Sequence, residues 1–87
     1  MSEDRLHIVS SAVVLVRPGE AEAVARALAG LPLTEVAASA GNKIVVVLEG
    51  ASRGEVGARL TTIALMDGVV GANMVFEHAE SDGEDPG

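Results

Sequence analysis

The sequence predicts an α+β domain with the element order strand, helix, strand, strand, helix, strand. Segments rich in β-branched residues alternate with segments whose apolar residues recur at helical spacing. The dipeptide Gly41-Asn42 stands between two strand-like segments, where a tight hairpin turn is expected. The chain has 87 residues, enough for one domain with a modest core.

The first strand is expected over residues 7–17. The run HIVSSAVVLVR is rich in β-branched residues and stops at Pro18, where a Pro-Gly pair indicates a turn. The next segment, PGEAEAVARALAGLP, has helical spacing of its apolar residues, and Glu22 can pair with Arg26 one turn later. Gly30 is expected to end this first helix.

A β-hairpin and a second helix are expected next. LTEVAASAGNKIVVVLEG reads as two strands around Gly41 and Asn42, residues that tolerate the positive φ angles of hairpin turns. Ser52 and Glu55 then have capping-box spacing, in which each side chain satisfies a free backbone N–H group at a helix start. A second helix therefore begins at this point.

The last strand is expected from Val69 to about His78, after Asp67-Gly68 ends the second helix. Together the six elements give a ferredoxin-like βαββαβ fold. Its four-stranded antiparallel sheet is expected in the order 4-1-3-2, with both helices on one face. The predicted organisation is a flexible N-terminus at 1–6, the domain at 7–78 and an acidic, disordered tail at 79–87.

Charge and composition exclude several classes of function. Thirteen acidic against six basic residues give a net charge of -7, which is unsuited to nucleic acid and favours a basic partner. The chain has no cysteine, so disulfides and thiolate metal sites are impossible. The polar start MSEDRLH does not resemble a secretory signal, and no apolar run is long enough for membrane insertion. A cytoplasmic protein is expected.

The sheet face without helices is the candidate interaction surface, because alternate residues of a strand point to opposite sides. Val70, Ala72, Met74 and Phe76 form the bulkier side of the last strand and are assigned to the core. Both sides of the strand after Asn42 are apolar, so its pattern does not choose a face. The residues proposed to bind a peptide on the open face are Val9, Ser11, Val13, Leu15, Ile44, Val46, Leu48, Asn73 and Val75.

No catalytic, metal or cofactor site is expected, so the protein is not expected to be an enzyme. An acylphosphatase-type enzyme needs a phosphate cradle, but Arg17 is followed directly by Pro-Gly-Glu, and Asn73 alone is weak support. His7 and His78 lie at the same end of the predicted sheet, but residue parity places them on opposite faces. No third ligand completes a metal site there.

In four sequence segments the chain resembles the NapD family, small chaperones for the catalytic subunit of periplasmic nitrate reductase. The resemblance rests on SSAVVLVRP, LPLTEVAAS, GNKIVVVLEG and MDGVVGANMVFEHAE, which together span roughly Ile8 to Glu80. Phe76 stands where the family commonly has Tyr, so any role of that hydroxyl group does not carry over.

The resemblance implies a chaperone that binds the twin-arginine signal peptide of the reductase precursor. A monomer is expected, because the open face is reserved for a peptide. The peptide would lie as a helix against the open sheet face, and export would wait until the molybdenum cofactor is inserted into the reductase. An alternative is a ligand-sensing module of the ACT type, which has the same element order and usually works as a dimer. A structural subunit of a mature enzyme is a third possibility.

Overall fold

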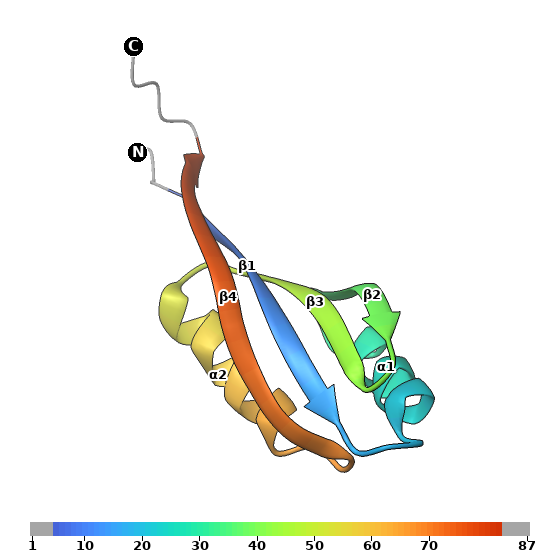
Figure 1. Cartoon of the computed structure of the whole chain (residues 1–87). Helices are drawn as coiled ribbons and strands as arrows, with labels where there is room; N and C mark the ends of the chain where they lie inside the picture. Colours follow the sequence, from blue (N-terminus) through green and yellow to red (C-terminus); the bar gives the residue numbers. More distant parts are fainter. Residues whose placement is uncertain (1–4, 83–87) are drawn as a thin grey trace.

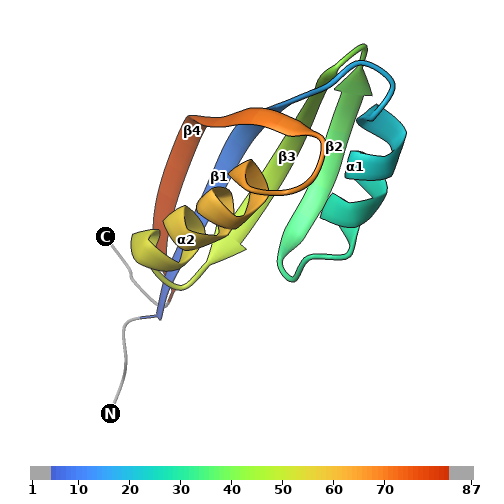
Figure 2. The ribbon, with the colours of Figure 1, turned by 90° about the horizontal axis from the view of Figure 1, so that it is seen from below.

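Six elements follow one another in the predicted order (Figure 1). The computed structural model describes residues 5–82. The elements are β1 (Arg5–Val16), α1 (Ala21–Ala29), β2 (Thr34–Ala40), β3 (Lys43–Gly50), α2 (Arg53–Ala64) and β4 (Val69–Asp82). Both helices lie on the same side of the sheet (Figure 2).

The four strands form one sheet in the order β2-β3-β1-β4, and every neighbouring pair is antiparallel. This arrangement confirms the predicted ferredoxin-like fold and its strand order. The chain turns between β2 and β3 at Gly41, whose φ of 61° lies in the left-handed region that favours glycine. The Gly-Asn hairpin is therefore confirmed.

The β1–β4 pair extends beyond the predicted domain limits of 7 and 78. Arg5 lies opposite Asp82 at the far end of the ladder, so β4 continues four residues past His78. The predicted boundary at 78 thus falls inside a strand. The other residues of the predicted flexible terminus and acidic tail, 1–4 and 83–87, lie outside the described residues.

Local interactions fix the start of α2 as the sequence predicts. The Ser52 hydroxyl accepts a hydrogen bond from the Glu55 backbone N–H at 3.0 Å. Glu55 Oε1 in turn accepts from the backbone N–H of Ala51 at 2.9 Å, one residue earlier than in the usual capping box. On α1, Glu22 and Arg26 form the predicted pair at 3.4 Å. Within residues 5–82, neither helix has both the length and the apolar character needed to cross a membrane.

The core lies between the helices and one face of the sheet. Its centre consists of alternate residues of β1 and β3, which pack against Val24 and Leu28 of α1 and Val56 and Ile63 of α2. The buried sheet residues are Ile8, Ser10, Ala12, Val14, Val16, Ile44, Val46, Leu48 and Gly50.

This arrangement corrects the prediction that Ile44, Val46 and Leu48 belong to the open face. All three are 0% exposed and lie under the helices. Both sides of β3 are apolar, so alternation alone could not choose a side. Pairing with β1 decides it, because Val46 lies opposite the buried Ala12.

Candidate functional site

Within residues 5–82, no element covers the sheet face opposite the helices, and we call it the open face. Its residues follow from the strand register, because partners in adjacent strands share a face. The open face comprises His7, Val9, Ser11, Val13 and Leu15 of β1, Lys43, Val45, Val47 and Glu49 of β3, Glu35, Ala38 and Ala40 of β2, and Gly71, Asn73, Phe76 and His78 of β4.

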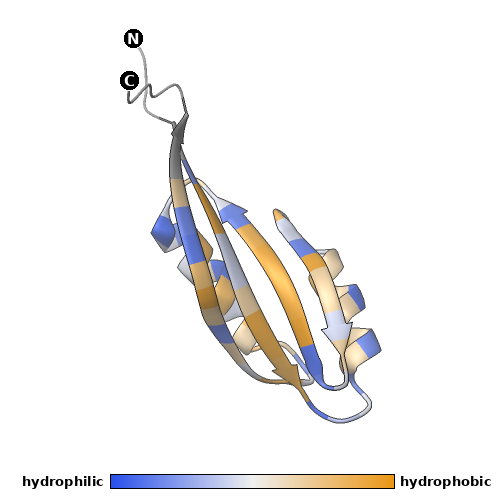
Figure 3. Cartoon of the chain, turned by 45° about the horizontal axis from the view of Figure 1, so that its top comes forward, coloured by the Kyte–Doolittle hydropathy of each residue, from blue (hydrophilic) through white to orange (hydrophobic). Residues whose placement is uncertain are grey.

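The centre of the open face is apolar, as Figure 3 shows along β1 and β3. Val9, Val13 and Leu15 are half-buried by their neighbours, as are Val45 and Val47 of β3. In Figure 3 the ribbon of β3 is hydrophobic between two hydrophilic ends, and the ribbon of β1 is hydrophobic in its second half, after a paler segment. Such a patch on a small domain is typical of an interaction surface.

A β-bulge in β4 places Phe76 on the open face, which corrects its predicted position in the core. Met74 lies opposite Ala12 and Phe76 opposite Ser11, so Val75 is the extra residue of the bulge. Phe76 is 58% exposed, and Val75 is 60% exposed. Phe76 therefore adds an aromatic ring to the face, beside the predicted Ser11.

Other predicted residues of β1 and β4 occupy the face as expected. Val13 lies opposite Val45 on one side and Asn73 on the other, so these three form a row across the sheet. Val9 lies between Glu49 and His78 in the same way. Register thus brings together the predicted Val9, Ser11, Val13, Leu15 and Asn73. Their role in binding stays a prediction.

The charged groups of the open face are unevenly distributed. Glu49 and Glu35 lie at the end where β3 finishes and β2 starts, and Lys43 lies at the opposite end, beside Leu15. His7 Nε2 is 3.4 Å from Glu49 Oε1, which is an ion pair whenever the imidazole is protonated. Among the described side chains, neither Glu35 nor Lys43 is within ion-pair distance of an opposite charge.

The bulge also moves His78 to the same face as His7, in contrast to the parity prediction. His78 lies opposite Val9, which shares its side of β1 with His7. In the part of the chain that the structure describes, no three His, Asp or Glu side chains are grouped to hold a metal ion. The shared face therefore gives these histidines no metal-binding geometry within that part.

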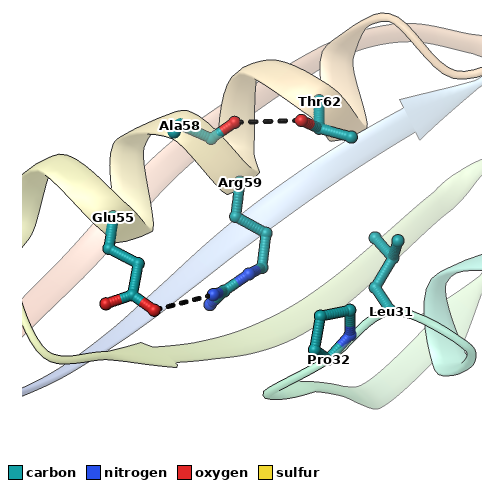
Figure 4. A pocket seen from close by; sticks show the side chains of 6 residues that line it. All are labelled: Leu31, Pro32, Glu55, Ala58, Arg59 and Thr62. Atoms are coloured by element: carbon teal, nitrogen blue, oxygen red, sulfur yellow. Dashed lines mark hydrogen bonds and ion pairs between the residues drawn. The ribbon is translucent and has the colours of Figure 1, made fainter.

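A single arginine links α2 to the end of β3 that carries Glu49. The Arg59 side chain is 11% exposed, donates a hydrogen bond to the Glu49 carbonyl oxygen and lies 3.4 Å from Glu55. It borders a shallow hollow on the helix side, across from Leu31 and Pro32 (Figure 4). Arg59 thus binds the end of β3 from the helix side of the sheet, whereas the Glu49 side chain lies on the open face.

The structure places both residues that were considered for acylphosphatase-type chemistry, Arg17 after β1 and Asn73 in β4. The Arg17 backbone N–H donates to the Gly68 carbonyl at 2.9 Å, and its side chain is exposed. Asn73 belongs to the row of Val13 and Val45 on the open face.

The fold and this face define a ferredoxin-like domain whose described elements leave one apolar side of the sheet uncovered. The chain belongs to the NapD family, whose model matches residues 7–81. A relative from Paracoccus pantotrophus named chaperone NapD is 52% identical over 75 residues, which cover 86% of this chain and 67% of the relative.

A solved structure supports the fold assignment independently. The solution structure of the E. coli Tat proofreading chaperone protein NapD matches with a TM-score of 0.76 at 20% identity. The match covers 93% of this chain and 86% of that chain. At this level of identity the likeness concerns the fold, and it agrees with the observed strand order.

Proposed function

We propose that this chain is a chaperone that binds the twin-arginine signal peptide of the periplasmic nitrate reductase precursor. Binding takes place in the cytoplasm and delays export until cofactor insertion and maturation are complete. The role is not enzymatic, because the peptide is held and released without a change in its covalent bonds. Membership of the NapD family and the chaperone name of the Paracoccus relative support this proposal.

The observation that carries the proposal is the uncovered apolar centre of the open face. Val9, Val13, Leu15, Val45 and Val47 offer a contiguous surface to which one side of an apolar helix fits. Burying apolar surface contributes about 25 cal/mol per Å², so this contact supplies most of the affinity. Phe76 adds a ring of the kind that often anchors an interface.

Charge supports the same kind of partner. A twin-arginine signal has a basic region followed by an apolar stretch, and this chain combines a net charge of -7 with an apolar face. Exposed ion pairs contribute only about 0–1 kcal/mol each. The acidic groups therefore guide and orient the peptide more than they hold it.

Calorimetric titration with a synthetic twin-arginine signal peptide tests the proposal. The control is the same peptide with its apolar residues replaced by Ser and Asn. We expect the parent peptide to bind and the polar control to lose most of its affinity. Equal binding of the two peptides would show that contact with the sheet is not the source of affinity.

A second experiment separates the proposed function from its alternatives. Affinity capture from cells that make the reductase, followed by N-terminal sequencing, should recover the unprocessed precursor. Recovery of only the mature enzyme would favour a structural subunit. A dimer in light scattering that a free amino acid stabilises would favour the ACT-type alternative, whereas we expect a monomer.

A further inference from the structure

We propose that the bound signal peptide lies along β1 in one direction, with its basic N-terminal region over Glu35 and Glu49 and its apolar stretch running toward Leu15 and Lys43. This inference rests on the proposed function and adds the orientation of the peptide. It follows from the distribution of charged and apolar residues along the open face.

The two ends of the open face carry opposite charges. Glu49 lies opposite Val9, at the first end of the apolar centre, and Glu35 lies in the next open-face row, opposite Val47. Lys43 lies opposite Leu15, near the end of β1. A peptide whose basic groups precede its apolar stretch meets attraction in one direction and repulsion from Lys43 in the other.

Glu49 can receive an arginine although His7 lies 3.4 Å away. A carboxylate has two oxygens and about four acceptor positions, so it can accept a guanidinium together with a histidine N–H group. Because Arg59 binds the Glu49 backbone carbonyl from the helix side, this end of β3 is fixed before the peptide arrives. The backbone that carries the Glu49 carboxylate therefore loses little further entropy on binding.

The dipole of the peptide helix favours the same direction. A helix carries a partial positive charge at its N-terminus and a partial negative charge at its C-terminus. Arginines at the N-terminus repel this positive end, so they destabilise the helix of the free peptide. Glu35 and Glu49 offset that penalty at one end, while Lys43 meets the negative end at the other.

The length of the apolar centre agrees with the apolar stretch of a signal peptide. From Val9 to Leu15 the strand advances six residues, or about 20 Å at roughly 3.3 Å per residue. A helix covers that distance with about 13 residues. Apolar regions of export signals span about 7–15 residues, or about 10–22 Å as a helix, so a region of intermediate length covers the face from Leu15 back toward the Ser11 row and leaves the basic residues at the Glu49 end.

Paramagnetic broadening in NMR spectra measures the orientation directly. The chain has no cysteine, so a spin label attached to a cysteine placed at either end of a synthetic twin-arginine peptide reports only on the peptide. With the label at the N-terminus, we expect broadening of the amide signals of Val9 and Glu49. With the label at the C-terminus, broadening should move to Leu15 and Lys43.

A charge-matched pair of variants tests the contribution of the acidic end. Glu35→Gln with Glu49→Gln should weaken binding of the peptide at low salt about five-fold. The control, Glu22→Gln with Asp67→Asn, changes the net charge equally at exposed positions outside the open face and should change affinity less than two-fold. With a peptide whose arginines are replaced by Gln, the two protein variants should bind alike.

The outcomes separate the orientation from the proposed function. Reversed broadening, or broadening that does not depend on the labelled end, overturns the orientation while leaving peptide binding in place. Equal losses in the two charge-matched variants also count against it, because only the net charge would then matter. Failure of the unlabelled peptide to bind the unmodified protein refutes the proposed function, and the orientation with it.

Discussion

Phe76 lies directly opposite Ser11 in the antiparallel pair of β1 and β4, on the face of the sheet that no helix covers. The pairing exists because Val75 is an extra residue in β4. Without the bulge, strict alternation would turn Phe76 toward the helices. One inserted residue therefore moves the single phenylalanine of the chain from the core to the candidate binding face.

Truncation of Phe76 tests whether its side chain lies on the candidate binding face or in the core. We expect Phe76→Ala to weaken signal-peptide binding by roughly 1–2 kcal/mol, as loss of an aromatic anchor does. Stability in urea should change by less than about 0.5 kcal/mol, because the side chain is 58% exposed. A core phenylalanine would instead lose about 3–5 kcal/mol of stability. Leu65→Ala, at a position 80% exposed after α2, is the control and should alter neither quantity.

A charge in the middle of the open face should block the peptide without unfolding the protein. Val13→Glu is expected to weaken binding by more than about 1.5 kcal/mol, because an apolar helix would bury the carboxylate without a partner. Val13 is only half-buried, so the circular dichroism spectrum should stay unchanged. Leu65→Glu adds the same charge elsewhere. Equal affinity of the two variants in calorimetry would mean that the wrong face has been assigned.

Most of the fold could be predicted from the sequence, because its signals are local. The Gly-Asn turn, the Ser52 cap and the Glu22–Arg26 pair each involve residues within a few positions of one another. The faces of β3 and β4 could not be predicted equally well. Both sides of β3 are apolar, and a bulge such as that at Val75 depends on pairing between distant strands.

The contrast between local signals and long-range strand pairing also explains which residues of the open face could be predicted. Alternation along β1 correctly assigns Val9, Val13 and Leu15 to the open face, because β1 pairs with β3 without a bulge from Ile8 to Leu15. Val45 and Val47 replace the predicted Ile44, Val46 and Leu48 because only the register shows which side of β3 faces the helices. The sequence carries no local signal for the bulge that places Phe76 on the open face.

Salt should act mainly on the rate of peptide association. Raising ionic strength from about 0.1 M to about 1 M shortens the Debye length from about 10 Å to about 3 Å. This screens the long-range attraction between a net charge of -7 and a basic peptide, but leaves apolar contacts in place. Stopped-flow measurements should show a larger fall in the association rate than rise in the dissociation rate. The opposite result would indicate that short-range ion pairs hold the complex.

Removal of one buried hydroxyl group should stabilise the fold. Ser10 is 0% exposed, and its Oγ atom has no hydrogen-bond partner among the described residues. An unsatisfied buried hydroxyl destabilises by about 1–3 kcal/mol, so Ser10→Ala should raise the free energy of unfolding by about 1 kcal/mol. Ser11→Ala, on the open face, is the matched control and should have little effect. A lower urea midpoint for Ser10→Ala would show that the hydroxyl is satisfied in solution.

A comparison of two glycines tests the packing of the turn before β4. Gly68 has a φ of 87°, and an added Cβ would lie 2.9 Å from Val24 Cγ2. Gly41 has a φ of 61° but open space around the same position.

The left-handed conformation alone disfavours alanine by about 1–2 kcal/mol, so Gly41→Ala should destabilise by about that amount. Gly68→Ala should lose about 1–3 kcal/mol more, because Val24 is a core residue of α1 and the clash forces the helix or the turn to move. Urea unfolding of both variants measures the difference. Equal losses would mean that the turn shifts without disturbing Val24, and that α1 is packed less tightly against this end of the sheet than the structure indicates.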